Sequence, residues 1–236
     1  MRANFVPLKI EAKKGKVAWQ SPSNIAIVKY WGKHGNQLPN NPSLSLSLSK
    51  SVSLMEVEYD LNPERKALEL DFLFEGKKEK NFELKVKTYL EKNESDFPYL
   101  SCLKLSIKSK NSFPHSAGIA SSASSMSALA LCLARMEDEN FVGFKTDEQF
   151  KTRASHLARL ASGSAARSIY GGLSCWGESE SVTGSSDYFA VPVSQGIHES
   201  FLTMQNAILL VDSSKKAVSS TMGHKLMADH PQAEMR

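Results

Sequence analysis

The sequence predicts a fold that mixes β-strands with helices, because two different hydrophobic periods occur along the chain. Residues 43–49 alternate serine with leucine, so Leu44, Leu46 and Leu48 share one face, which predicts a half-buried strand. Residues 119–133 instead place apolar side chains three and four positions apart, which predicts a helix with one apolar stripe. Both kinds of element recur elsewhere in the chain.

The first half of the chain reads mainly as strands. Residues 16–31 predict either a strand pair or one strand followed by a turn, because two apolar clusters lie within them. The phase of the alternation changes between Leu54 and Met55, which predicts a bulge or a break there. The other elements expected in this half are a strand at 68–74, a turn at 75–77 and a surface helix at 81–93.

The second half alternates strands, helices and segments of small residues. A strand at 103–107 leads into the small-residue segment 113–134, which becomes the helix noted above. The further elements expected are a helix at 148–160, strands at 172–177, 187–191 and 207–212, and a helix that starts near Ser219 or Ser220.

The composition is that of a globular chain rather than a membrane or nucleic-acid-binding one. Of its 236 residues, 41% are hydrophobic and 23% charged, and the net charge of +4 suits a small anionic ligand better than nucleic acid. No apolar run is long enough for a membrane span. The cysteines, Cys102, Cys132 and Cys175, form no CxxC pair, so we expect free buried thiols in a reducing cytoplasm.

The chain is expected to divide near residue 200. The region from Pro192 to Ser200 is a plausible border, so we assign residues 1–200 to a ligand-binding N-terminal domain. Residues 201–236 are expected to begin a second α+β domain that is incomplete in this chain.

Four segments rich in small or hydroxyl residues are interpreted as ligand-binding segments: 24–33, 118–125, 162–167 and 215–221. In the first, Lys29 and Tyr30 leave a strand on opposite sides, so a turn at Gly32 is needed to bring Tyr30 and Lys33 together. The alternative for the lysines is a solvated surface. The alternative for Arg167 is a surface position near a helix N-terminus, where a cation is unfavourable unless an anion is bound.

Residues 113–134 are typical of a loop that binds an anion at a helix N-terminus, since small side chains let phosphate oxygens approach the main chain. The alternative is an ordinary helix with a serine-rich start. The spacing is not that of the Gly-x-x-x-x-Gly-Lys-Ser/Thr loop. The six histidines show no metal-ligand spacing and are expected on the surface or in loops, and no residue is assigned to a metal.

Taken together, five ordered motifs over residues 21–223 resemble the diphosphomevalonate decarboxylase family of the GHMP kinase superfamily. The motifs are SPSNIAIVKYWGK (21–33), NPSLS (41–45), FPHSAGIASSA (113–123), SGSAARSIYGG (162–172) and VSSTMG (218–223). The resemblance implies a GHMP kinase-like, two-domain α+β fold. It also implies ATP-dependent decarboxylation of (R)-5-diphosphomevalonate to isopentenyl diphosphate, with 3-hydroxyl phosphorylation, in the cytoplasmic mevalonate pathway.

The resemblance implies a role for each motif residue. It assigns the ATP phosphates to Gly118, Ser121, Ser122, Ser219 and Ser220, and the substrate diphosphate to Tyr30, Lys33, Ser162 and Ser164. Arg167 is expected to orient the substrate carboxylate and Lys29 to organise its pocket. The expected catalytic residues are therefore Arg167, Ser220 and Lys29. ATP and Mg2+ are the implied cofactors, and a homodimer is a possible assembly.

Some positions depart from the family pattern. Ala166 replaces the usual cysteine, and His115 and Ser116 replace Thr-Ala. No acidic residue of this chain matches the motif of the family's catalytic aspartate, so we expect the chain as given not to turn over. The alternatives are a related mevalonate 3-kinase or phosphomevalonate decarboxylase, and a non-catalytic ATP- or substrate-binding fragment.

Overall fold

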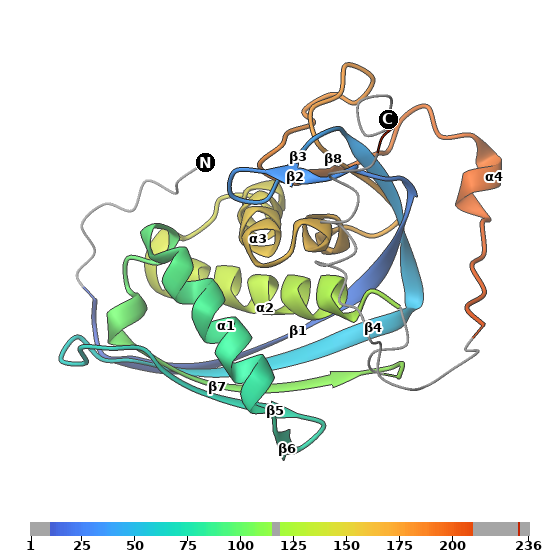
Figure 1. Ribbon diagram of the computed structural model, residues 1–236. Coiled ribbons are helices and arrows are strands. Elements are labelled where there is room, and N and C mark those ends of the chain that lie inside the picture. Colours follow the sequence, from blue (N-terminus) through green and yellow to red (C-terminus); the bar gives the residue numbers. More distant parts are fainter. Residues whose placement is uncertain (1–9, 115–118, 210–230, 232–236) are drawn as a thin grey trace.

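Two antiparallel strands, β1 (Lys13–Val28) and β4 (Ser43–Leu61), are the longest strands of the computed structural model, which describes residues 10–114, 119–209 and 231. Besides β1, strand β4 pairs with β7 (Leu103–Asn111) along its second half and with β8 (Leu173–Trp176) along its first half. Figure 1 shows β1 and β4 bending upward around one end of the central helix α2 (Ser121–Glu137).

The remaining strands extend the sheet on both sides. Strand β5 (Glu69–Phe74) runs parallel to β7, and the short β6 (Lys77–Lys78) folds back onto β5. At the other side, β9 (Ala190–Pro192) pairs with β8. The order is β6-β5-β7-β4-β8-β9, with β1 on β4. A separate two-stranded hairpin is made of β2 (Lys33–His34) and β3 (Leu38–Pro39).

The long strands confirm one alternative and correct one expectation. Residues 13–28 form one strand, followed by the turn at Gly32, as one of the two alternatives for residues 16–31 predicts. The strand tolerates Pro22 because, among the described strands, β1 pairs with β4 alone. No break occurs between Leu54 and Met55. The register shifts instead opposite Pro22 and Ser23, where three residues of β4 lie between the paired Leu48 and Val52.

Three helices pack on one side of the sheet: α1 (Lys80–Lys92), α2 and α3 (Asp147–Ala161). The short α4 (Glu199–Leu202) is exposed and lies apart from them in Figure 1. The chain also forms 3-10 turns η1 (Glu94–Asp96), η2 (Leu100–Cys102) and η4 (Gly163–Ile169) and a π-helical turn η3 (Asp138–Val142). Helix α2 lies across the centre of the molecule, with α1 in front of it and α3 above it (Figure 1).

Helix α2 is buried on more sides than one apolar stripe would cover. Ala128, Leu129 and Ala134 are all fully buried, because β1, β4, α3 and η4 surround the helix. Ile119, which the sequence pattern placed on the stripe, precedes the first turn. The core continues from α2 to the second half of β4 and to β7, where Val57, Leu105 and Ile107 have no exposed surface.

Most predicted elements are confirmed with small changes of boundary, namely those at 68–74, 81–93, 103–107, 148–160 and 172–177. The strand expected at 187–191 is reduced to Ala190–Pro192, and residues 207–209 form no strand. The remainder of that strand and the helix near Ser219 lie outside the described residues, and the domain division near residue 200 stays a prediction. No helix in the described ranges combines the length and apolar character needed to cross a membrane.

Candidate functional site

The first half of β4, which pairs with the end of β1, carries a polar inner face. The half-buried strand expected over 43–49 is present, but its buried residues are Ser43 and Ser45, while its three leucines are only partly buried. The same odd-numbered face continues inward as Met55 and Val57 in the second half. The phase change at residue 54 is therefore a change in the chemistry of one continuous inner face, from a polar site to an apolar core.

Arg167 lies at the centre of this polar face. It belongs to η4 and is only 2% exposed. Its Nη1 donates to the Ser43 hydroxyl, which in turn donates to the Trp176 carbonyl at 3.1 Å, and its Nη2 is 3.5 Å from the Asn24 Oδ1. The Ser174 hydroxyl holds the Arg167 carbonyl at 3.0 Å. The surface alternative for this arginine is thus excluded.

The Arg167 charge is not neutralised by a carboxylate in the part of the chain that the structure describes. No ion pair to Arg167 occurs there, and its Nε has no hydrogen-bond partner although it is buried. Burial lowers the pKa of the guanidinium to about 10, which still leaves it charged at neutral pH. A buried, incompletely paired guanidinium is costly unless an anion completes it, so this pocket fits a carboxylate or phosphate ligand.

Tyr30 and Lys33 converge beside Arg167 through the turn expected at Gly32. The backbone of Gly32 adopts φ +101°, a left-handed conformation that favours glycine. Lys33 Nζ lies 6.0 Å from the centroid of the Tyr30 ring, and the Arg167 guanidinium carbon lies 5.4 Å from it. The Tyr30 ring also meets Trp176 edge to face, with 4.9 Å between centroids.

Burial also changes the acid–base properties of these groups. It raises the pKa of Tyr30, an effect that the Arg167 charge and the hydrogen bond to the Ser164 side chain partly oppose. Burial lowers the pKa of Lys33. The cluster therefore presents a phenol that stays protonated and two cations to a shared space, which is the chemistry that phosphate oxygens require.

Gly163 lets the second small-residue segment approach this cluster. A Cβ at this position would lie 2.6 Å from the Trp176 ring and 3.2 Å from the Lys33 side chain. A larger residue at position 163 would overlap the Trp176 ring, so this position requires glycine. The Asn24 amide reaches the same segment and donates to the Ser164 carbonyl at 3.0 Å. Ser162, Ser164 and Arg167 are thus held near Tyr30 and Lys33, as the sequence motifs predict.

The N-terminus of α2 offers a second anion-binding feature. Ala120 precedes the helix with φ 49°, a left-handed conformation that costs a non-glycine residue about 1–2 kcal/mol. Among the described residues no side chain caps the helix, so the first N–H groups, including those of Ser121 and Ser122, have no side-chain acceptor there. The Ser23 hydroxyl donates to the Ile119 carbonyl at 2.5 Å and ties this helix start to β1. Such an end fits a phosphate.

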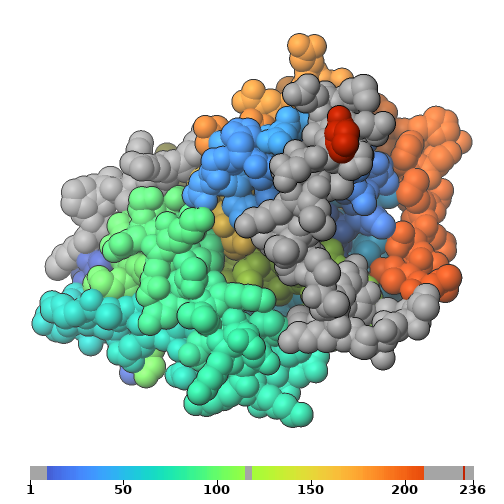
Figure 2. All heavy atoms as spheres, in the orientation of Figure 1, coloured from blue at the N-terminus to red at the C-terminus, as the bar shows by residue number. Residues whose placement is uncertain are grey.

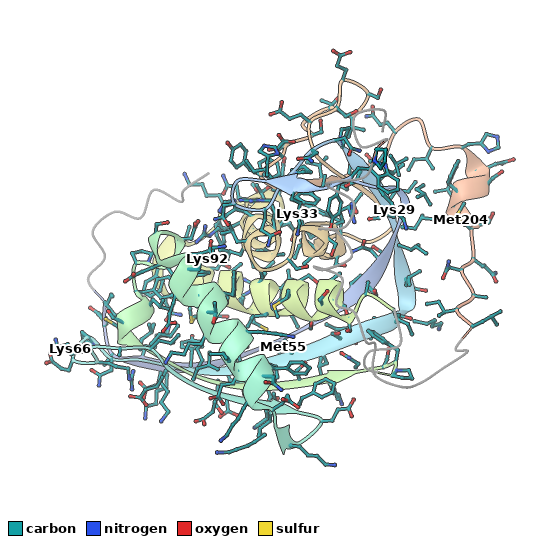
Figure 3. All side chains as sticks on the ribbon, in the orientation of Figure 1. Lys29, Lys33, Met55, Lys66, Lys92 and Met204 are labelled. Atoms are coloured by element: carbon teal, nitrogen blue, oxygen red, sulfur yellow. The ribbon has the colours of Figure 1, made fainter. Side chains whose placement is uncertain are left out.

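Not every predicted site residue joins the cluster. Lys29 is exposed at the end of β1, and no contact within the described ranges links its side chain to Arg167. Figure 3 shows Lys33 above the helices and Lys29 to its right, beside the upper ends of β1 and β4. Gly118, Ser219 and Ser220 lie outside the described residues, so their roles stay predictions.

Sequence reasoning missed three residues of the pocket. Asn24 bridges η4 to β1, Ser43 accepts from Arg167, and the Trp176 ring forms one wall. Asn24 and Ser43 lie within motifs that were noted for other residues, whereas nothing near Trp176 marked it. One histidine expectation is wrong, since His156 is 8% exposed and lies in α3. The described ranges contain no group of three or more potential metal ligands.

The chain matches a family of known proteins and several of their structures. The family described as "Diphosphomevalonate decarboxylase-like N-terminal domain" matches residues 21–190. Diphosphomevalonate decarboxylase of Schizosaccharomyces pombe is 36% identical over 217 residues, which cover 86% of this chain and 52% of the relative. The chain therefore spans about half the length of the curated relatives it matches.

Two solved structures show the same fold. Mevalonate diphosphate decarboxylase from Staphylococcus aureus aligns with a TM-score of 0.60 and 32% identity, over 79% of this chain and 51% of that chain. A structure described as MDDEF in complex with MVAPP, AMPPCP and magnesium aligns with a TM-score of 0.55 and 32% identity, over 78% and 51%. These similarities confirm the α+β fold and the resemblance drawn from the five motifs.

Proposed function

The chain belongs to the diphosphomevalonate decarboxylase-like N-terminal domain family, and from this membership we propose that it binds substrate for an ATP-dependent decarboxylation. The substrate is (R)-5-diphosphomevalonate, and the products are isopentenyl diphosphate, ADP, phosphate and CO2. This reaction belongs to isoprenoid biosynthesis through the mevalonate pathway.

The observation that carries this proposal is the buried Arg167 guanidinium. It lies beside Tyr30 and Lys33, and no carboxylate in the described ranges pairs with it. A ligand that brings one carboxylate and one diphosphate satisfies this arrangement, with the carboxylate on Arg167 and the diphosphate on Tyr30, Lys33, Ser162 and Ser164. The two ends of the substrate are then fixed by different residues.

Arg167 contributes to the reaction by fixing the carboxylate. ATP supplies the phosphoryl group that converts the tertiary 3-hydroxyl into a leaving group. When that phosphate leaves, the electron pair of the bond between the carboxylate and its neighbouring carbon forms the new double bond, and CO2 is released. A guanidinium bound to both carboxylate oxygens holds this bond in one orientation. We keep Lys29 as a candidate that adds positive charge to the pocket, with Ser220 near the transferred phosphate.

We propose that ATP places its phosphates at the N-terminus of α2, on Gly118, Ser121 and Ser122, with Ser219 and Ser220 nearby. The uncapped start of α2 supports this assignment. Mg2+ is expected to bind mainly to the phosphates, because it commonly keeps several waters and takes few protein ligands. We also propose a cytoplasmic location and a homodimeric assembly, both of which rest on the family resemblance.

A coupled assay tests the proposed function. The full-length product of the gene is supplied with ATP, Mg2+ and (R)-5-diphosphomevalonate, and ADP and CO2 are measured together. Equal amounts of both are expected. ADP without CO2 would identify a 3-kinase, and activity only on the monophosphate would identify a phosphomevalonate decarboxylase. Binding without either product would leave a ligand-binding role, and no binding would contradict the proposal.

A further inference from the structure

The hairpin that carries Lys33 is held from beneath by Arg159 of α3. Arg159 is 2% exposed, and its Nη1 donates to the Asn36 carbonyl at the tip of the hairpin. Its Nε donates to the Tyr188 carbonyl at 2.8 Å, in the segment between β8 and β9. One buried guanidinium therefore joins two surface segments to the same helix.

The orientation of Arg159 is set by a short chain of side chains. Arg159 Nη2 lies 3.4 Å from His156 Nδ1, and His156 Nε2 lies 3.0 Å from the Asp96 carboxylate. Burial lowers the pKa of His156, which favours the neutral ring. A neutral ring that donates from Nε2 to Asp96 presents Nδ1 as the acceptor for Arg159, so the contacts agree with one another.

The hairpin is short, and beyond its strand pairs it is held by Asn40, which contacts His34 and the Trp31 carbonyl. Only two residue pairs join β2 to β3, and isolated two-stranded hairpins are marginal even when longer. Asn36 gains a second tie from its side chain, which donates to the Asn93 Oδ1 at 3.0 Å just after α1. Figure 2 agrees with this contact, since the blue surface of the hairpin region lies directly against the green surface of α1.

The position of Lys33 depends on this support. The Lys33 side chain lies close to Gly163 and to the Tyr30 ring, and its ammonium group donates to Gln37 within the hairpin. A shift of the hairpin would carry Lys33 and Gln37 away from Gly163 and from Arg167 together. The hairpin therefore connects Arg159 to the ligand pocket, since it contacts Arg159 through Asn36 and carries Lys33.

We propose that Arg159 is a positioning residue for the diphosphate part of the site, which acts by fixing the hairpin and, through it, Lys33. His156 and Asp96 orient the Arg159 guanidinium for this task. The inference rests on the proposed role of Lys33 in diphosphate binding, and it assigns to Arg159 no contact with the ligand.

The hold on the hairpin is measured without any ligand. Amide hydrogen exchange in the full-length protein is expected to be about tenfold faster over residues 33–40 in Arg159→Gln, since one well-made charged hydrogen bond is worth about that factor. Exchange within α2 is expected to stay unchanged. The control is Lys151→Gln, a surface cation of the same helix that pairs with Asp147. Unchanged exchange at 33–40 would overturn the proposal.

The effect on the site is measured by a double-mutant cycle. Arg159→Gln and Lys33→Met are each expected to weaken (R)-5-diphosphomevalonate binding about tenfold, and the double variant no further, because both act through Lys33. The dissociation constant of MgATP is expected to stay unchanged, whereas general structural damage would raise both constants. Additive losses would overturn the proposal.

The cycle separates failure of this inference from failure of the proposed function. If the wild-type protein does not bind (R)-5-diphosphomevalonate, the proposed function fails. If Lys33→Met weakens binding and Arg159→Gln does not, the positioning role of Arg159 fails alone. Should Arg159→Gln not fold, Arg159→Lys keeps the charge and loses the fork that spans two carbonyls, so it is expected to show the same pattern with a smaller loss.

Discussion

The guanidinium carbon of Arg167 lies 5.4 Å from the centroid of the Tyr30 ring, although the two residues come from segments far apart in the sequence. The aromatic face gives the cation partial compensation for its burial without neutralising it. The arginine therefore keeps a full charge for an external anion. The same contrast between buried charges with and without a charged partner can be tested elsewhere in the chain.

Arg167→Met is expected to abolish most ligand affinity while leaving stability unchanged or raised. The guanidinium is buried without a carboxylate in the described ranges, so an apolar side chain of similar length removes a desolvation cost. Binding of (R)-5-diphosphomevalonate is expected to weaken at least about 100-fold, because charge-assisted hydrogen bonds to a carboxylate are lost. Calorimetric binding and chemical denaturation measure the two effects, and a destabilised variant would contradict this account.

Arg153→Met is expected to have the opposite effect on stability. Arg153 is also buried, with 5% of its surface exposed, but it pairs with the fully buried Glu137 at 2.8 Å and with Asp96 at 3.1 Å. Removing it takes the cation away from the fully buried Glu137 carboxylate, which costs about 3–5 kcal/mol in the free energy of unfolding. The comparison of the two arginines by urea denaturation tests whether the pairing, rather than burial, decides the sign.

Gly163→Ala is expected to destabilise the protein by about 1–3 kcal/mol and to weaken ligand binding, because the new methyl group would overlap Trp176 and press on Lys33. Gly171→Ala is the control, since no atom lies within 4 Å of a Cβ built there. Thermal unfolding and the tryptophan fluorescence spectrum report the displacement. Equal behaviour of the two variants would show that the close approach at Gly163 is not needed.

His156 is expected to make stability fall as the solution becomes mildly acidic. Burial lowers the pKa of His156 in the folded protein, so the unfolded chain binds the proton more strongly and acidification favours unfolding. The loss begins as the pH falls through the ordinary histidine value of about 6.5. Urea denaturation at about pH 8 and about pH 5.5 measures it, and His156→Gln is expected to show a smaller difference between these conditions.

Asp96 is expected to make stability depend on pH in a second, more acidic range. Burial alone would raise the pKa of Asp96, but the His156 hydrogen bond and the charges of His156 and Arg153 more than offset it, so the pKa lies below its usual value. Stability that depends on the ionised carboxylate is therefore lost only as the pH falls below about 4. An identical acid response of wild type and His156→Gln above that pH would assign the transition to other groups.

The sequence was most informative where local chemistry constrains the backbone. The turn at Gly32 follows from the need to bring Tyr30 and Lys33 to one side of a strand that would otherwise separate them, and the structure has this turn at φ +101°. The helices at 80–92 and 147–161 followed from their apolar spacing, and Thr146 caps the second by accepting from the Gln149 amide. These signals depend only on residues close together in the chain, so they can be recognised from the sequence alone.

The serine face of β4 shows where such reasoning fails. An alternating pattern of serine and leucine predicts that the two faces of the strand differ in burial, and the leucine face is normally expected in the core. In this strand Ser43 and Ser45 are inside, because η4 brings the buried Arg167 against Ser43 and leaves the leucines on the other face. His156 was misplaced for the same reason, since its partner Asp96 comes from a distant 3-10 turn. Neither pairing has a signature within a few residues.

The sequence by itself determined the residue types of the site, the turn that brings Tyr30 to Lys33, and the family to which the chain belongs. The tertiary structure alone decided that Arg167 is buried without a carboxylate in the described ranges, that Asn24, Ser43 and Trp176 complete its pocket, and that Arg159 supports the hairpin of Lys33. The physical reason is that burial and charge pairing depend on contacts between distant segments. Periodicity and capping depend only on neighbours along the chain.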